Sequence, residues 1–200
     1  MARYTGPKNK LSRREGADLF EKASKMRRLT IPPGVHGPKA AGRKQSEFGL
    51  QLREKQKVKR FYGVLEKQFR RYYQLASKQT GSTGESLLRL LECRLDNLIV
   101  RAGLAPTRAM ARQLIVHNHI LVDNLTVNRP SYQITLGQVV TLNTKAQNIP
   151  TIVKLLENTE ADIPKWLKRK AATVKIQSLP TSDDISEEFN EQAIVEFYSR

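Results

Sequence analysis

The amino-acid sequence predicts an α+β protein, in which a mostly helical, basic part is followed by two helices packed on a small antiparallel sheet. Three observations predict this fold class. Apolar residues recur at helical spacing over residues 58–75 and again over residues 87–99, and short runs rich in branched residues follow over residues 119–143. With 200 residues, 39% of them hydrophobic, the chain can bury the core of one large or two small domains.

The first thirty residues are basic, with an amphipathic stretch around Leu19, Phe20, Ala23 and Met26. The following loop, TIPPGVHGPKAAGRKQ (residues 30–46), is predicted to lack regular structure, because its prolines and glycines interrupt helices and strands. Its positive charge comes from Lys39, Arg43 and Lys44.

The strongest helical pattern lies in residues 58–75. Its apolar positions are Val58, Phe61, Leu65, Phe69, Tyr72 and Leu75. At about 100° per residue, Arg60, Lys67 and Arg71 line one face, nearly opposite this stripe. Further basic residues nearby are Lys55, Lys57, Lys59 and Arg70, against only Glu54 and Glu66. Because such an excess of like charge repels itself, phosphate contact is favoured over a merely solvated face.

The next helix starts within KQTGSTGES, where Ser82 and Glu85 have capping-box spacing and Thr83 is an equally good N-cap. Its leucine-rich stripe ends near Gly103, a residue type that commonly follows a helix. Thr107 is the expected N-cap of a short second helix. The pattern therefore predicts a helix, a tight turn and another helix.

Strand-like segments follow: HILVD, LTVN, YQITL and VVTLN. Asp123 and Asn124 form a turn dipeptide between the first two, since both tolerate a positive φ. Residues 87–145 are therefore predicted to hold two helices and then three to four antiparallel strands. Residues 150–185 show no clear period and are expected to be loops around short elements. The chain ends in SEEFNEQAIVEFYSR, a helical turn with an apolar patch.

The charge distribution indicates the class of partner. The net charge is +16, and residues 1–90 carry 22 Lys and Arg against 7 Asp and Glu, whereas the last twenty residues carry 1 against 6. The basic residues of the first half are interleaved with Phe and Tyr, which favours a nucleic acid over the alternative of a generally basic, solvated surface. No run of about 18 apolar residues and no secretory signal is present, so we expect no membrane contact and a cytoplasmic or organellar protein.

The sequence offers no enzyme active site. It lacks the glycine-rich phosphate loops and the G-x-S-x-G elbow. Cys93, alone in the chain, is expected to be buried as a small apolar residue, and one cysteine excludes an internal disulfide and a multi-cysteine zinc site. Three histidines, His36, His117 and His119, do not make a metal site by spacing alone. We therefore expect no enzyme activity, no cofactor and no metal.

The stretch RQLIVHNHILVDN contains two of those histidines. Such a pair can bind a metal, move a proton, contact phosphate or mark a turn, and the shortage of cysteine and carboxylate partners disfavours the first two. We interpret the stretch as a helix end, a turn at Asn118 and a strand start. His117 is the better candidate for RNA contact, and His119 is expected to belong to the strand start.

Four arginines lie near this turn in the predicted hairpin. Arg94 and Arg101 are seven apart on its first helix, and Arg108 and Arg112 are four apart on its second. Together they would make a positive ridge, to which Thr107 adds the free N–H groups of a helix N-terminus. Such a ridge suits RNA, whose major groove is too deep and narrow for side chains to read, so that shape and backbone are recognised.

Pairing inside the fold is the alternative for two of these arginines. Arg94 and Arg101 lie close in sequence to Glu92 and Asp96. Ion pairs with these carboxylates would occupy the guanidinium groups without any RNA.

Residues 87–124, LLRLLECRLDNLIVRAGLAPTRAMARQLIVHNHILVDN, resemble the S-four RNA-binding domain. That domain also occurs in RNA-modifying enzymes and in one class of aminoacyl-tRNA synthetase. The flanking segments are similar to the bacterial small-subunit ribosomal protein S-four family over essentially the whole chain. These segments are MARYTGPKNKLSRREG, PPGVHG, QLREKQKVKRFYGVLEKQFRRYY and NEQAIVEFYSR.

The resemblance implies a structural constituent of the small ribosomal subunit that binds ribosomal RNA (rRNA) early, helps nucleate assembly of the subunit body and contributes to translational accuracy. It implies ribosomal protein S-five and other small-subunit proteins as partners, and messenger RNA near the loop that holds Lys39, Arg43 and Lys44. It also implies two domains, residues 1–86 joined by 180–200, and residues 87–179. The expected location is the cytoplasmic small subunit, or an organellar ribosome.

The chain departs from the family's pattern in three places. Many members carry zinc-binding cysteines near the N-terminus, where this chain has Leu and Ser at residues 11–12, so we expect packing to replace the metal. Members often have glycine where this chain has Asn118 and Asn124, and asparagine tolerates the left-handed conformation, so the turns should persist. Leu125 and Thr126 stand where members often have basic residues, which weakens the case for RNA contact at that hairpin tip.

Two other classes compete with this interpretation. An RNA-modifying enzyme would need a catalytic domain, and the residues after the RNA-binding module hold no acid/base or nucleophile pattern. A regulatory RNA binder is disfavoured by the full-length resemblance. The residues predicted to contact RNA are Arg3, Lys8, Arg13, Arg14, Lys39, Arg43, Lys44, Arg53, Lys55, Lys57, Arg60, Lys67, Arg70, Arg71, Arg94, Arg101, Thr107, Arg108, Arg112, His117 and Asn118.

Overall fold

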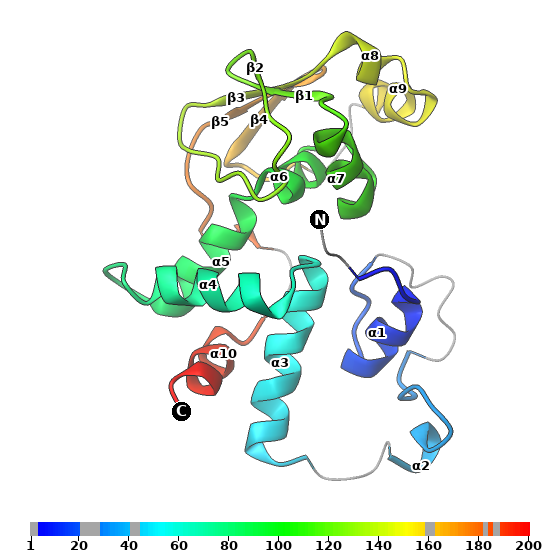
Figure 1. Ribbon diagram of the computed structural model, residues 1–200, viewed down its shortest axis with the longest axis vertical. Helices are drawn as coiled ribbons and strands as arrows, with labels where there is room; N and C mark the ends of the chain where they lie inside the picture. The colour runs from blue at the N-terminus through cyan, green and yellow to red at the C-terminus, as the bar shows by residue number, and fades with distance from the viewer. Residues whose placement is uncertain (1–3, 21–28, 41–44, 159–162, 182–183, 186–188) are drawn as a thin grey trace. The chain divides into compact units, whose positions relative to one another are not determined.

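The computed structural model describes residues 4–20, 29–40, 45–158, 163–181, 184–185 and 189–200, with residues 39 and 40 described by their backbone alone (Figure 1). The chain forms two compact units. Unit 1 comprises residues 1–84 and 187–200, and unit 2 comprises residues 85–186. Each unit has its own apolar core.

Unit 1 is helical. Its helices are α1 (Lys8–Glu15), α2 (Gly37–Ala40), α3 (Glu47–Phe61), α4 (Glu66–Ala76) and α10 (Glu191–Tyr198). Side-chain caps fix two of the starts, since Ser46 Oγ accepts from the Gly49 N–H before α3 and Asn190 Oδ1 accepts from the Ala193 N–H before α10.

The last residues of the chain complete the core of unit 1. Helix α10 packs along α3, as Figure 1 shows. The Phe48 and Phe197 rings stack with their centroids 5.6 Å apart, and the Tyr73 and Tyr198 rings stack at 4.6 Å. The apolar patch predicted at the C-terminus therefore belongs to the core of the N-terminal helices.

The helical pattern of residues 58–75 forms two helices rather than one. Helix α3 ends at Phe61, Gly63 takes a left-handed φ of 61°, and the Val64 N–H bonds back to the Lys59 carbonyl. A glycine adopts this conformation at little cost, so the chain turns before α4 begins at Glu66. The prediction that Arg60 shares one helix face with Lys67 and Arg71 is therefore wrong.

The loop prediction for residues 30–46 also needs a correction, because α2 forms one short helical turn within it. Pro38 is the second residue of that turn, where its missing N–H removes no helical hydrogen bond. In the amphipathic stretch before this loop, Leu19 is buried. Ala23 and Met26 lie outside the described residues.

Unit 2 begins with α5 (Thr83–Glu92), α6 (Leu95–Arg101) and α7 (Arg108–Val116). The leucine-rich stripe predicted as one helix breaks at Arg94, whose ψ of 138° is extended. There the Cys93 carbonyl accepts from the Ile134 N–H, and the Leu95 N–H donates to the Tyr132 carbonyl. Pairing with a distant segment thus replaces helical hydrogen bonds, and Arg94 precedes α6 instead of lying on a helix.

Helix α7 follows the sequence signals closely. Gly103 has a φ of 67° after α6, and Thr107 Oγ1 accepts from the Met110 N–H at 3.3 Å. At the other end of α7, Asn118 has a φ of 60°. The predicted N-cap and both predicted turn positions are confirmed.

The sheet of unit 2 has five antiparallel strands in the order β2-β1-β3-β5-β4. They are β1 (Ile120–Val122), β2 (Leu125–Thr126), β3 (Val139–Leu142), β4 (Leu167–Lys170) and β5 (Thr173–Ile176). The turn at Asp123 and Asn124 is confirmed, with φ values of 48° and 67°. The segment YQITL contributes an isolated bridge between Gln133 and Arg94 instead of a strand.

The remaining elements lie in residues 144–176, part of which was expected to be loops around short elements. They are α8 (Thr144–Gln147), α9 (Pro150–Glu157) and the β4–β5 hairpin. Ala171 turns that hairpin with a φ of 51°, and because alanine gives no turn signal, the hairpin was not predicted.

The core of unit 2 lies between α6, α7 and one face of the sheet (Figure 1). Its sheet residues include Ile120, Val140, Leu142 and Val174, which alternate with residues of the opposite face. The α+β class is confirmed, while the predicted domain ranges 1–86 with 180–200 and 87–179 stay a prediction. Among the helices of the described residues, none is long and apolar enough to cross a membrane.

Candidate RNA interface

Two buried carboxylates, Asp96 and Glu92, lie among four of the arginines of unit 2. Asp96 lies at the start of α6 with its side chain 1% exposed. Arg94, two residues earlier in the chain, binds both oxygens of this carboxylate, with Nε 2.9 Å from Oδ1 and Nη2 2.8 Å from Oδ2. Arg112 of α7 donates from Nε to Oδ2 at 2.7 Å. Asp96 therefore holds two guanidinium groups in one charge-assisted network.

Glu92 binds Arg101 directly and is linked to Arg108 through Asn97. Arg101 donates from Nη2 to Glu92 Oε1 at 3.0 Å and from Nε to Oε2 at 3.2 Å. Asn97 donates from Nδ2 to Glu92 Oε2 at 2.7 Å, and its own Oδ1 accepts from Arg108 Nε at 2.9 Å. Arg108 is thus oriented through Asn97.

The structure brings together the four arginines expected to form a ridge, but around carboxylates. The ion pairs stated as the alternative are present, with Arg94 on Asp96 and Arg101 on Glu92. The Arg94 side chain is 5% exposed, so its main role is in the fold. Arg108 is half-buried, so part of its side chain is accessible to a ligand. RNA contact by all four stays a prediction.

The turn after α7 separates the two histidines, as expected. His117 is exposed at the end of the helix. His119 is half-buried, with Nδ1 3.3 Å from Asn143 Oδ1, and Asn143 also donates to the Asn118 carbonyl at 3.1 Å. His119 thus belongs to the strand start, while RNA contact by His117 and Asn118 stays a prediction.

In unit 1, Glu15 pairs with two arginines that the sequence assigned to RNA. Its carboxylate lies 3.3 Å from Arg53 Nη1 and contacts Arg60 Nη1, and its side chain is 1% exposed. Burial raises the pKa of Glu15 above its usual value, although Arg60 and Arg53 oppose that shift. Glu15 is the last residue of α1 and both arginines belong to α3, so these ion pairs join the two helices.

Glu66 gathers two lysines and a tyrosine. Lys55 Nζ lies 2.9 Å from Oε1, Lys59 Nζ lies 2.8 Å from Oε2, and the Tyr198 hydroxyl donates to Oε1 at 2.7 Å. Burial alone would raise the pKa of Glu66, but these hydrogen bonds outweigh it and lower the pKa to about 2. Burial and the hydrogen bond to Glu66 raise the pKa of Tyr198.

Lys55 is a structural cation rather than a surface charge. It is 5% exposed, and its Nζ lies 4.2 Å from the centroid of the Phe197 ring as well as beside Glu66. A buried lysine with an ion pair and a cation–π contact is committed to the core. The prediction that Lys55 contacts RNA has no support in this geometry.

Other basic residues of unit 1 also have partners inside the unit. Arg13 donates from Nε to the Ile31 carbonyl at 2.9 Å and so holds the loop after α1. Lys57 lies 3.8 Å from Glu54, a surface pair of little energetic weight. Lys8 lies over the Phe20 ring at 5.3 Å.

Helix α4 presents an open group of basic residues in unit 1. Lys67, Arg70 and Arg71 are all exposed, and their i, i+3, i+4 spacing places them on one helix face. The ion pairs in the described part of the chain involve none of the three. We call these residues the α4 basic face.

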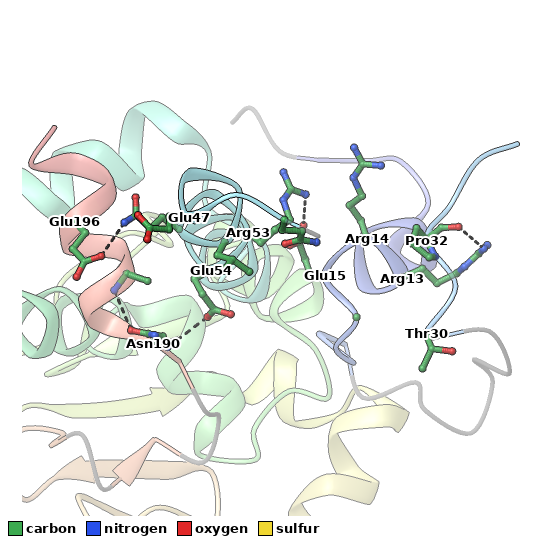
Figure 2. Close-up of a pocket in the computed structure, with 15 residues that line it drawn as sticks. Arg13, Arg14, Glu15, Thr30, Pro32, Glu47, Arg53, Glu54, Asn190 and Glu196 are labelled. Carbon is green, nitrogen blue, oxygen red and sulfur yellow. Dashed lines mark hydrogen bonds and ion pairs between the residues drawn. The ribbon is translucent and has the colours of Figure 1, made fainter. Parts of the chain in front are cut away.

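A groove of about 780 Å³ opens in unit 1 between α1, α3 and α10 (Figure 2). Its lining mixes both signs of charge. The cations are Arg13, Arg14 and Arg53, and the carboxylates are Glu15, Glu47, Glu54 and Glu196. Since four carboxylates line the groove and Glu15 pairs with Arg53, the groove is a poor phosphate site, and Arg14 is its exposed cation.

Several predicted contacts lie outside the described residues. These are Arg3, Arg43, Lys44 and the side chain of Lys39. In contrast, three exposed lysines of the unexpected β4–β5 hairpin are not among the residues predicted to contact RNA: Lys168, Lys170 and Lys175. The runs KWLKRK and TVKI contain these lysines, but only the strand register places them on one face.

Cys93 is buried, as expected, and burial together with the neighbouring Glu92 raises the pKa of its thiol to about 11. A thiol with this pKa is protonated at neutral pH and is a poor nucleophile. No cluster of three or more His, Cys, Asp or Glu that could hold a metal occurs within the described residues.

Comparison with known proteins matches both parts of the chain. The family described as "Ribosomal protein S4/S9 N-terminal domain" matches residues 3–92, and the "S4 domain" family matches residues 93–140.

Full-length relatives named "Small ribosomal subunit protein uS4" cover 100% of this chain and of their own length. They include proteins of Vesicomyosocius okutanii (49% identical over 209 residues), Cutibacterium acnes (50% over 204) and Pseudomonas aeruginosa (50% over 211). By these matches, the chain belongs to the uS4 family of small ribosomal subunit proteins.

Proposed function

We propose that this chain is a structural constituent of the small ribosomal subunit and that it binds small-subunit rRNA, without enzyme activity. The observation that carries the proposal is the full-length match to relatives named as small-subunit proteins. The open basic surfaces supply the physical means, because neutralising phosphates releases counterions and drives association.

The two units would contact RNA in different ways. In unit 1, the α4 basic face offers three exposed charges on one helix, which suits a phosphate backbone. In unit 2, Arg108 and Arg112 are held by Asn97 and Asp96 before any RNA arrives. Such preorganisation reduces the side-chain entropy lost on binding.

The finer roles implied by the resemblance belong to the same proposal. The chain would bind rRNA early, help nucleate assembly of the subunit body and contribute to translational accuracy. Ribosomal protein S-five, other small-subunit proteins and the incoming messenger RNA would be its partners, in the small subunit of a cytoplasmic or organellar ribosome.

Sedimentation tests the proposal directly. Tagged chain expressed in Pseudomonas aeruginosa, whose uS4 is 50% identical, is expected to co-migrate with small ribosomal subunits and to be found there by mass spectrometry. The double variant Arg108→Ala and Arg112→Ala should enter subunits less well. Wild-type chain confined to the top of the gradient would overturn the proposal.

A further inference from the structure

The outer face of the unit 2 sheet carries lysines that the proposed contacts do not use. In β4, Leu167 is buried and Arg169 turns inward, where its Nη2 donates to the Leu155 carbonyl at 2.8 Å. Successive side chains of a strand point to opposite faces. Lys168 and Lys170 therefore point outward, and both are exposed.

The strand register brings a third lysine to this face. Lys168 and Lys175 are direct partners across the β4–β5 pairing, and Lys175 is also exposed. Lys170 lies two residues along the same strand, roughly 6.8 Å away at the usual rise of an antiparallel strand. We call Lys168, Lys170 and Lys175 the lysine face.

The lysine face is electrostatically unfavourable within the free chain. Like charges directly opposite each other destabilise a strand pair. The five strands contain no Asp or Glu, and no ion pair in the described ranges joins these lysines to a carboxylate. At the β1–β2 turn of the same sheet, the carboxylate of Asp123 accepts from the Val139 N–H. An anionic ligand would relieve this repulsion.

The neighbouring side chains favour a nucleic acid over an acidic protein. Beside the lysines lie Thr141 and Thr173, whose hydroxyls are 3.3 Å apart, and then the half-buried Leu121 and Val139. No aromatic residue or methionine occurs in the five strands. Protein interfaces deplete lysine and use aromatic or methionine anchors, whereas nucleic-acid interfaces are polar and strongly positive.

We propose that the lysine face is an additional rRNA contact, at which three ammonium groups bind the phosphodiester backbone without reading base sequence. This inference rests on the proposed function. Lysine binds phosphate as a point charge, so the contact tolerates many backbone geometries.

The test compares two full-length triple variants of equal charge. Lys168→Gln, Lys170→Gln and Lys175→Gln remove the lysine face. Lys78→Gln, Lys145→Gln and Lys154→Gln remove three other exposed lysines, none of which lies in the sheet. The probe is small-subunit rRNA of Pseudomonas aeruginosa, titrated by filter binding at several salt concentrations.

The lysine-face variant should lose about tenfold in affinity, and its salt slope should fall by about two to three, at roughly 0.7 to 0.9 per phosphate released. The control variant should change less than about threefold. Equal losses in the two variants would show a general charge effect and overturn the proposal. If the wild-type chain does not bind the RNA at all, the proposed function itself fails.

Two further readouts exclude a folding defect and a protein ligand. The melting temperature of Lys175→Gln should equal or exceed that of the wild type, since a repulsion is removed, and a drop large enough to explain weaker binding would contradict the proposal. Acetylation of the three lysines, followed by mass spectrometry, should be blocked in the chain–rRNA complex. Protection that begins only when other subunit proteins are added would assign the surface to a protein instead.

Discussion

Asp96 joins α6 to α7 through Arg112, whose Nε donates to Asp96 Oδ2 at 2.7 Å. The same carboxylate binds Arg94, so a single buried acid holds a side chain before α6 and another on α7. Most of the arginines predicted to make an RNA-binding ridge are therefore also part of the internal structure of unit 2.

Replacing Asp96 should destabilise the fold. Asp96→Asn removes the buried carboxylate that pairs with Arg94 and Arg112, and loss of one partner of a buried ion pair costs on the order of 3–5 kcal/mol. Urea unfolding followed by circular dichroism measures the change. Asp184→Asn, outside this network, is the control, and equal unfolding free energies in the two variants would contradict the buried role of Asp96.

Neutralising the α4 basic face should weaken RNA binding without loss of stability. Lys67→Gln, Arg70→Gln and Arg71→Gln remove three exposed charges, so the salt slope for rRNA should fall by about two to three. The melting temperature should stay within a few degrees of the wild type.

Lys55→Gln provides the contrast within unit 1. It should lower stability, because it breaks the pair with Glu66 and the contact with the Phe197 ring, while the salt slope stays nearly constant. A large slope change for Lys55→Gln and none for the α4 variant would reverse the assignment of structural and RNA-binding residues.

Glu66 should make the stability of the chain depend on acid pH. Its pKa in the folded state is about 2, below the value of 4.5 for an unperturbed Glu, so its contribution is fully present above pH 4.5 and is lost as the pH falls toward 2. The side chain is 45% exposed, so after solvent screening we expect about 1 kcal/mol.

Unfolding free energies at pH 6 and at pH 3 measure this dependence. Glu66→Gln should lose stability at pH 6 and should show a smaller fall between the two pH values than the wild type. An unchanged pH dependence in the variant would assign the titration to other carboxylates.

The turn at Asn118 should tolerate glycine but not a branched residue. Asn118 has a φ of 60°, which glycine adopts readily and valine does not. Asn118→Gly should stay within about 1 kcal/mol of the wild type, and Asn118→Val should cost more, of order 1–3 kcal/mol. Thermal unfolding of both variants checks the order, and equal stabilities would deny a conformational role to this residue.

Local signals predicted the parts of unit 2 whose geometry depends on near neighbours. Thr107 caps α7, and Asn118, Asp123 and Asn124 take the left-handed conformation that their side chains tolerate. The apolar and branched patterns also placed α7 and the strands β1, β2 and β3 within a few residues.

Helix ends and side-chain contacts that depend on tertiary structure could not be predicted from the apolar periodicity. The apolar stripe continues in phase across Gly63 and across Arg94, where the chain turns or pairs with residues 132–134. Likewise, the number of basic residues near α3 did not indicate that the Lys55 ammonium group packs against the Phe197 ring. A charge pattern shows which residues are cations, whereas burial shows which of them are available to RNA.

The exposed cations of α4 and the partly exposed Arg108 are proposed to bind rRNA, while the buried and paired Lys55 and Arg94 hold the fold. Crosslinking of the full-length chain to small-subunit rRNA, with mapping of the attached residues by mass spectrometry, tests this assignment most directly. We expect crosslinks at Lys67 and Arg70 of the α4 basic face and around Arg108, and none at Lys55 or Arg94. Crosslinks concentrated at Lys55 and Arg94, with α4 unmodified, would contradict it.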